Sequence, residues 1–285
     1  MCDLAGSQRA MAVAQMPVSS FAFMALAVFL IGAAPVTAAD NPVAAAQAFI
    51  VTLSDNEAKT VLAPFDSADR KAVRFTPGGR GGLTLKAMDA QTRQAAMQFL
   101  GATLSAEGIE MVTKIRQREE ILGRMTGNPG YRDPDLYYLA LFGDPGSGPW
   151  GYRFEGHHLS VNMTYRGDQL ISGVPVMLAS NPEKTDAPDA PAELLGPLVE
   201  DARQAASDPE ARKRVIAALT AHIPGALRDT YRADLAARPT LREFDDTWSG
   251  FDLLGGNAKL EIETNQTNHI HITFRDEISD FGGGR

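Results

Sequence analysis

The sequence contains a single cysteine, Cys2, near the start of the chain. One cysteine cannot form an internal disulfide, and it cannot supply the thiolates that iron–sulfur clusters and cysteine-type zinc sites need. Any bound metal ion must therefore be held by nitrogen and oxygen ligands.

Positive charge is also in deficit, with 27 lysines and arginines against 35 aspartates and glutamates, a net charge of -8. No block of basic residues interrupts this balance. Nucleic acids and anionic membrane surfaces are therefore not expected as partners.

Long hydrophobic runs are nearly absent, and the one that occurs lies over residues 21–34. Small residues follow it at Val36-Thr37-Ala38, and this order is typical of a secretory signal peptide. The run is shorter than the roughly 20 residues that a membrane-spanning helix needs. We therefore expect a signal peptide over residues 1–38, a periplasmic or secreted protein, and no stable membrane anchor after cleavage. Cys2 would leave with the signal peptide.

Two hydrophobic periodicities follow one another along the remaining chain. Spacings of three and four residues predict helices at 41–63 (with a second helix at 54–62), 89–104, 106–125, 192–206 and 208–222. Alternation and turn sequences predict strands at 71–75, 136–142, 150–165, 169–178, 259–264 and 269–275. This order predicts an α+β fold rather than a doubly wound one. We expect a single domain over residues 39–285, with helices flanking an antiparallel sheet made of a meander and a C-terminal hairpin.

Four segments have structural interpretations. The glycine-rich residues 78–82 lack the ending of a phosphate-binding loop and predict a flexible loop. The charges of residues 116–120 predict a solvated helix face. Residues 181–191, rich in proline and aspartate, predict a connection within one domain. His222 lies two residues before Pro224 at a helix end, where a positive charge is favourable.

Histidine is scarce, and four of the five histidines lie in two clusters, His157-His158 and His269-Ile270-His271. Imidazole binds transition metals and moves protons near neutral pH. Alternate residues of a strand share a face, so His158 is predicted to lie on a polar face, and His269 and His271 are predicted to point the same way. If the two hairpins are neighbours in one sheet, these three imidazoles converge on a three-nitrogen site with an open position, as catalytic zinc, copper or iron requires.

Three further residues have candidate roles beside this site. His157 is either packed in the core or serves as a fourth metal ligand or an outer partner of one. Glu155 is a candidate general base, or an outer partner of a ligand, and Arg275 is a candidate clamp for an anionic group. The alternative is that all these side chains only form hydrogen bonds or a surface ion pair.

The histidine segments also carry a family resemblance. It rests on residues 138–145, on the run Phe154-Glu155-Gly156-His157-His158-Leu159, and on the terminal His269-Ile270-His271 with Arg275-Asp276. These segments resemble the bacterial Domain of Unknown Function 3500 family, and the resemblance implies no particular activity. Three hypotheses follow from the residues: a metal-dependent hydrolase or oxidoreductase, a non-catalytic binder of a metal ion or small-molecule ligand, and a structural envelope protein.

Overall fold

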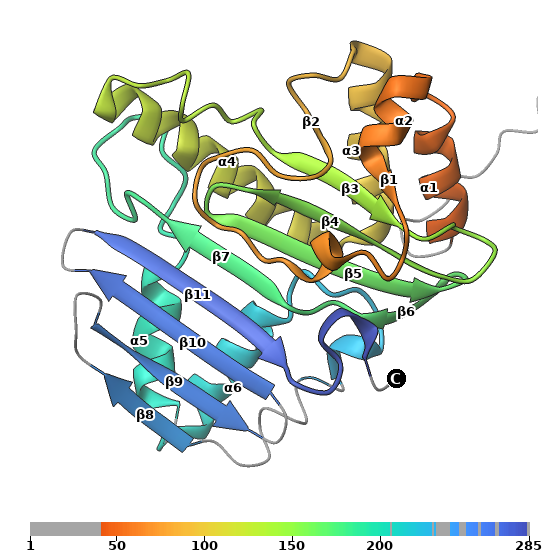
Figure 1. Ribbon diagram of the computed structural model, residues 1–285. Helices are drawn as coiled ribbons and strands as arrows, with labels where there is room; N and C mark the ends of the chain where they lie inside the picture. The colour runs from red at the N-terminus through yellow and green to blue at the C-terminus, as the bar shows by residue number, and fades with distance from the viewer. Residues whose placement is uncertain are drawn as a thin grey trace, which may run out of the picture. The chain divides into compact units, whose positions relative to one another are not determined.

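The computed structural model describes residues 41–205, 207–229, 231, 240–244, 249–255, 258–265 and 268–283. The predicted signal peptide lies outside these residues. A mixed fold with a large, mostly antiparallel sheet is confirmed (Figure 1). Whether residues 39–285 form a single domain stays a prediction.

The described part of the chain forms an eleven-stranded sheet whose main path runs β1-β3-β4-β5-β7-β11-β10-β9-β8. The strands are β1 Leu62–Ala63, β2 Leu83–Thr84, β3 Tyr138–Phe142, β4 Pro149–Gly156, β5 Leu159–Arg166, β6 Gln169–Ser172, β7 Val176–Ser180, β8 Thr240–Phe244, β9 Ser249–Gly255, β10 Ala258–Asn265 and β11 His269–Asp276. β1 pairs with β3 in parallel, and the other pairs are antiparallel. The C-terminal strand β11 lies between β7 and β10. This placement joins the early strands to the C-terminal ones.

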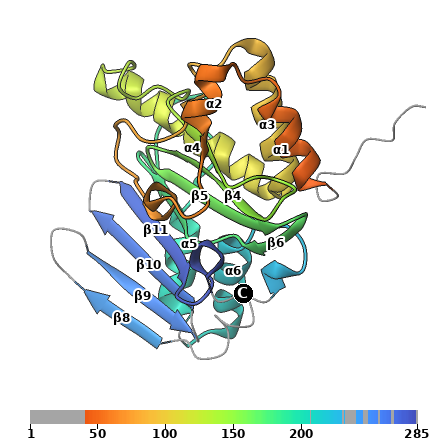
Figure 2. The ribbon, with the colours of Figure 1, turned by 45° about the vertical axis from the view of Figure 1, so that its right-hand side comes forward.

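Helices cover one face of this sheet. They are α1 Pro42–Ile50, α2 Asp55–Val61, α3 Ala90–Thr103, α4 Ala106–Thr126, α5 Gly196–Gln204 and α6 Pro209–Leu219. The short 3-10 helices η1 Ala68–Lys71 and η2 Asp280–Gly282 lie on the opposite face, where Arg70 donates to the Thr164 hydroxyl and the Phe281 carbonyl. Figures 1 and 2 show α4, α5 and α6 behind the sheet. In α4, Ser105 accepts the N–H of Gly108, and Gly127 in the left-handed conformation ends the helix.

The two faces of the sheet differ in chemistry. Toward the helices, β5 presents Leu159, Val161 and Met163, all buried in the hydrophobic core. The opposite face, which we call the front face, carries polar residues of the same strand, such as Ser160 and Asn162. These are also buried. Residues 72–82, which we call the covering segment, pass over β4 and β5 on this side (Figure 1).

The predicted strand at 150–165 is wrong in one respect, because a turn at His157 and His158 divides it into β4 and β5. Sixteen residues exceed the usual strand length of about 3–10, so length alone argued for a break. The strand predicted at 71–75 is also absent from the described residues, since η1 ends at Lys71 and irregular backbone follows.

The prediction of a solvated face at residues 116–120 is wrong for two members. Arg118 is 1% exposed and Glu119 is 2% exposed. The Arg118 guanidinium donates to four carbonyl oxygens at 2.6–3.1 Å, those of Pro182, Glu183, Pro191 and Ala192. Arg118 therefore fastens the connection at residues 181–191 to α4.

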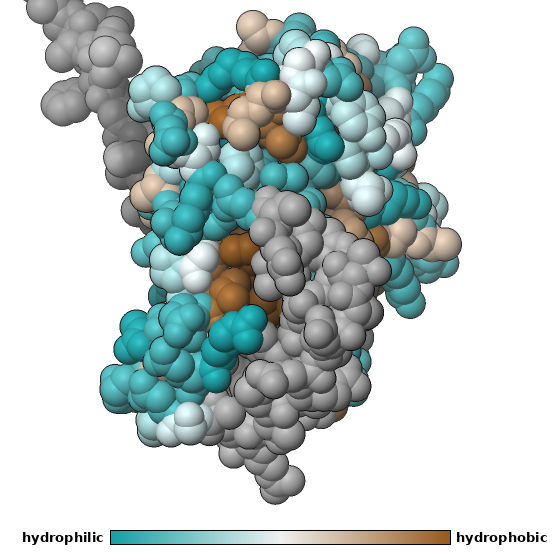
Figure 3. Space-filling view, turned by 90° about the vertical axis from the view of Figure 1, so that its left-hand side faces the viewer, coloured by the Kyte–Doolittle hydropathy of each residue, from teal (hydrophilic) through white to brown (hydrophobic). Residues whose placement is uncertain are grey.

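Hydrophobic side chains occupy little of the described surface on the side shown in Figure 3, where they form separate small patches among hydrophilic residues. In the described part of the chain, none of the helices combines the length and the apolar character needed to cross a membrane.

Candidate metal centre

The turn between β4 and β5 holds His158 in an uncommon backbone conformation. Its φ is 65°, in the left-handed region that residues other than glycine rarely adopt. Two backbone hydrogen bonds fix it there: His158 donates its N–H to the Phe75 carbonyl at 3.1 Å, and its own carbonyl accepts the Ala179 N–H at 2.8 Å. The covering segment and β7 therefore hold the turn from two sides.

Three imidazoles meet beside this turn. The Nε2 atom of His269 lies 2.9 Å from Nε2 of His158 and 2.9 Å from Nε2 of His271. His269 and His271 lie on the same side of β11, and the pairing of His271 with Ala179 on β7 brings them to the turn. The structure thus brings together the three histidines that the sequence predicts to converge.

The Nε2 atom of His269 has more close nitrogen neighbours than it can satisfy. A neutral imidazole nitrogen carries either one hydrogen or one in-plane lone pair, so it forms one good hydrogen bond. Two nitrogens nevertheless lie 2.9 Å from it. One of these contacts therefore lacks a well-placed hydrogen, and a cation that accepts all three lone pairs would remove the repulsion.

Burial keeps these imidazoles uncharged. His158 is 2% exposed, and burial, followed by the neighbouring imidazoles, lowers its pKa well below the ordinary value. Burial likewise lowers the pKa of His269 and of His271 to about 4. At neutral pH all three rings are in the neutral form that binds metals.

The outer nitrogens of two of these rings face polar side chains. The Asn181 amide lies 3.4 Å from Nδ1 of His269, and the Glu263 carboxylate lies 3.9 Å from Nδ1 of His271. A partner that accepts the Nδ1 hydrogen orients a metal-binding histidine and leaves Nε2 for the ion. The Glu263 carboxylate can accept that hydrogen, whereas the Asn181 contact is made by the amide nitrogen, which donates.

His157 lies in the same cluster, but its ring nitrogens have other contacts. Nδ1 is 2.5 Å from the Glu119 carboxylate, and Nε2 is 2.9 Å from the Arg132 guanidinium. Its ring stacks on that of His158 with 3.5 Å between centroids. The structure therefore does not place His157 with the three converging Nε2 atoms.

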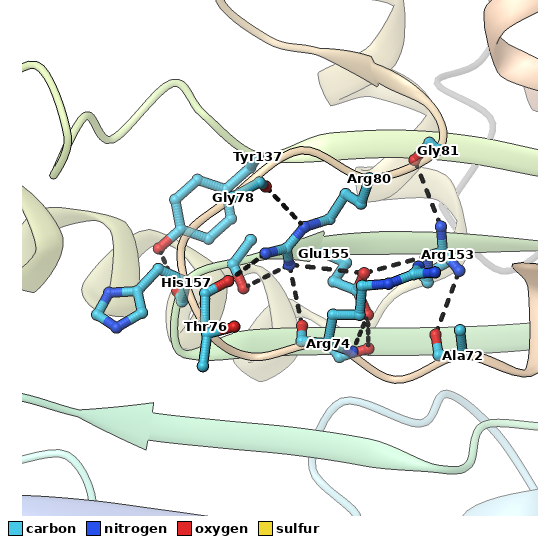
Figure 4. A network of polar contacts seen from close by, with 12 residues as sticks. Ala72, Arg74, Thr76, Gly78, Arg80, Gly81, Tyr137, Arg153, Glu155 and His157 are labelled. Carbon is cyan, nitrogen blue, oxygen red and sulfur yellow. Dashed lines mark hydrogen bonds and ion pairs between the residues drawn. The ribbon is translucent and has the colours of Figure 1, made fainter.

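Glu155 is not beside the histidine rings. Its side chain is fully buried on the front face, where it accepts the Ser160 hydroxyl and the Arg74 N–H, both at 2.9 Å. Arg153 and Arg80 lie 3.4 and 3.5 Å from its other oxygen (Figure 4). Burial raises the pKa of Glu155 although these partners oppose the shift. Glu155 thus lies inside a polar network that holds the covering segment.

Arg275 is also remote from the histidines. It lies four residues beyond His271 on β11, about 13 Å along a strand. Its side chain is 48% exposed and pairs with Asp280 at 2.7 Å. The structure therefore does not bring Arg275 to the centre.

Sequence reasoning missed Glu119, Arg132 and Phe75. Glu119 had a detectable signal, because it lies four residues after Ile115 and three before Leu122, on the hydrophobic stripe of α4. Arg132 and Phe75 lie in irregular segments, whose position no periodicity predicts.

The sequence profile of the family described as Protein of unknown function (DUF3500) matches residues 36–243. The chain belongs to this family. The match includes the β4–β5 turn of this DUF3500 protein, whereas His269 and His271 lie beyond its end. No curated protein and no solved structure matches the chain.

Proposed function

We propose that this DUF3500 protein is a metal-dependent enzyme, hydrolytic or oxidative, that holds a zinc, copper or iron ion on Nε2 of His158, His269 and His271. The observation that carries the proposal is the pair of 2.9 Å contacts around the His269 nitrogen. Neutral, buried imidazoles with converging lone pairs repel one another, and a bound cation turns that repulsion into attraction.

Two of the three spacings between these nitrogens, both at His269, suit such an ion, and all three ligand nitrogens lie within 4.8 Å of one another. Imidazole binds transition metals at about 2.0–2.1 Å, so two nitrogens on one ion lie roughly 2.9–3.4 Å apart at bond angles of 90–109°. The contacts at His269 fall at the short end of that range. Three protein ligands leave a position for water or substrate, where the ion can lower the pKa of water or polarise a carbonyl.

A second candidate is a protein that binds a metal ion or a small molecule without catalysis. A pocket of about 230 Å³ lies beside the cluster, lined by Tyr131, Tyr138, His157 and others, but not by the three proposed ligands. A molecule held there would not contact the metal ion. The pocket therefore fits a protein that binds a small molecule better than one that converts it at the metal ion.

We further propose that the protein is exported to the periplasm or secreted after cleavage behind Ala38. The hydrophobic run at residues 21–34 and the small residues after it support this proposal. N-terminal sequencing of protein from cell fractions tests it. Protein that stays in the cytoplasm with residues 1–38 attached would contradict it.

Elemental analysis tests the metal proposal. Protein purified without a histidine tag should hold close to one metal ion per chain, and a His158→Ala/His271→Ala double variant should hold little. Absence of stoichiometric metal from the wild-type protein, even after incubation with zinc, copper or iron salts, would refute both metal-binding hypotheses.

The open position is tested on cobalt-substituted protein. Azide should shift the visible absorption bands if water occupies a fourth site, as catalysis requires. Bands that do not respond would indicate a shell closed by protein, and the non-catalytic candidate would then hold.

A further inference from the structure

We infer that His157 is a positioning residue for the metal centre: it fixes the ring plane of His158 by stacking and does not bind the ion. This inference rests on the proposed metal site, because its role is defined by the nitrogen that His158 presents there. The sequence alone leaves the roles of fourth ligand and outer partner open. The geometry separates them.

Stacking is incompatible with shared coordination. An imidazole nitrogen binds a metal ion along its lone pair, which lies in the plane of the ring. The rings of His157 and His158 are 3.5 Å apart at centroids and only 30° from parallel. In-plane lone pairs of two such rings run side by side and do not converge on one ion. By contrast, the planes of His158 and His269 differ by 66°, and those of His269 and His271 by 87°.

Hydrogen bonds account for both nitrogens of His157. Its Nδ1 contacts the Glu119 carboxylate, which only accepts, so Nδ1 carries the hydrogen. Arg132 only donates, and one of its nitrogens lies 2.8 Å from Nδ1 and 2.9 Å from Nε2. Because Nδ1 carries the hydrogen, the lone pair that faces this donor is the one on Nε2. The ring is therefore a neutral tautomer that donates on one side and accepts on the other. Glu119, His157 and His158 also have ligand atoms within 4.8 Å of one another, but a metal ion on Nε2 of His157 would have to displace Arg132.

These contacts tie the ring to rigid elements. Glu119 is buried on α4, and the guanidinium of Arg132 lies 3.7 Å from its carboxylate. The Tyr137 hydroxyl donates to the His157 carbonyl at 2.8 Å. The close approach of Tyr137 needs Gly156, since a Cβ there would lie 2.5 Å from the Tyr137 ring. Glu119 on α4 and Arg132 thus determine the plane of the His157 ring, Tyr137 fixes its backbone, and the stack passes the plane on to His158.

The consequence concerns the direction of one lone pair. Rotation of the His158 ring about its Cβ–Cγ bond would swing Nε2 away from His269. The stacked ring of His157 opposes that rotation on one face. Loss of such an outer partner typically lowers metal affinity about 10–100-fold.

Two substitutions separate a stacking role from a ligand role. His157→Phe keeps a ring and removes both nitrogens, whereas His157→Ala removes the ring. Metal affinity, measured by competition with a chromophoric zinc chelator, should fall about 10–100-fold in His157→Ala and stay within about threefold of wild type in His157→Phe. Met125→Ala, at an exposed position on the helix that carries Glu119, is the matched control and should match wild type.

Other outcomes overturn the inference. Equal losses in both variants would mean that His157 acts through a nitrogen, and unchanged affinity in His157→Ala would mean that the stack has no effect. If neither variant folds, the count of histidine nitrogens in the electron paramagnetic resonance spectrum of copper-loaded wild-type protein decides, with three expected and four contradicting. A wild-type protein that binds no metal would instead refute the proposed function.

Discussion

The ring of Phe75 meets the imidazole of His271 edge-on, with 5.3 Å between centroids and 64° between planes. Phe75 belongs to the covering segment and is 39% exposed. Its carbonyl also accepts the N–H of His158. One residue of an irregular segment therefore touches both halves of the histidine cluster.

Replacement of Phe75 by alanine should open the centre to solvent without dismantling it. The backbone hydrogen bond to His158 is retained, and the side chain is partly exposed already. We expect metal loss to excess chelator to be faster by about tenfold, measured by stopped-flow absorbance. Tyr131→Ala removes another exposed aromatic and serves as the control. Equal rates for wild type and Phe75→Ala would show that Phe75 does not cover the ion.

His269→Ala should be the most damaging of the single ligand substitutions. His269 lies between the other two rings and contacts both. We expect metal affinity to fall by more than about 100-fold, beyond the range typical of an outer partner. Calorimetric titration with zinc measures it. A fall smaller than that of His158→Ala would contradict the central place of His269.

Glu155→Ala should lower stability and leave the metal content unchanged. The substitution leaves Arg153, the Ser160 hydroxyl and the Arg74 N–H without their buried acceptor. Breaking a buried ion pair from one side costs about 3–5 kcal/mol of unfolding free energy. Urea denaturation tests the expected loss of stability, and elemental analysis tests the unchanged metal content. Loss of metal at unchanged stability would restore Glu155 as a partner of the centre.

Arg118→Met should destabilise the fold by about 3 kcal/mol, because four carbonyl oxygens lose a charged donor. Arg124→Met, six residues on in the same helix, is the matched control. Its ion pairs with Glu120 and Asp189 are exposed, so its effect should stay below about 1 kcal/mol. Urea denaturation of both variants checks the contrast, and equal effects would contradict it.

His222 should make stability fall in mild acid. The residue is buried against the Gly173 carbonyl, and burial lowers its pKa to about 4 from an ordinary value near 6.5. The unfolded chain therefore binds a proton between about pH 6.5 and 4 that the folded protein excludes. Stability contributed by the neutral ring is complete above pH 6.5 and is lost as the pH falls toward 4, by about 3 kcal/mol at most.

His222→Gln removes that proton and should flatten the slope of unfolding free energy against pH in this window. Urea titrations of metal-free protein at several pH values test it, with Ile278→Val, an exposed position, as a control that leaves all five histidines in place. An unchanged slope in His222→Gln would contradict the prediction. The structure also corrects the expectation of a favourable charge at this helix end, because the ring is buried and neutral.

The spacing of hydrophobic residues predicts the helices and most strands, because that spacing depends only on residues close together in the sequence. Asp89, Ser105 and Gly127 mark the ends of α3 and α4 in the structure as their capping chemistry suggests. The pairing of β11 with β7 is not predicted by the sequence; the three-histidine site is predicted only if the two hairpins are neighbours in one sheet. Strand neighbours so distant in the chain leave no local signal, and only the fold places them together.

In the candidate site, too, local geometry predicts some of the arrangement and only the fold decides the rest. His269 and His271 share a face because strand geometry requires it. His158 reaches them by another route, since it lies in a turn where alternation does not apply. The sequence predicts roles for Glu155 and Arg275 only because they are near histidines along the chain. Side chains near in sequence need not be near in space, and the network of Glu155 and the ion pair of Arg275 lie elsewhere.

The insertion of β11 between β7 and β10 has a consequence for how the centre comes into being. His158 leaves the ribosome 111 residues ahead of His269, an interval of roughly 5–20 s at common rates of synthesis. Until the last strand docks, His158 lacks the two β11 imidazoles with which it would bind the ion of the proposed centre. The proposed centre would therefore bind its metal ion only in a chain that has been synthesised through β11, and not in a shorter, incomplete chain.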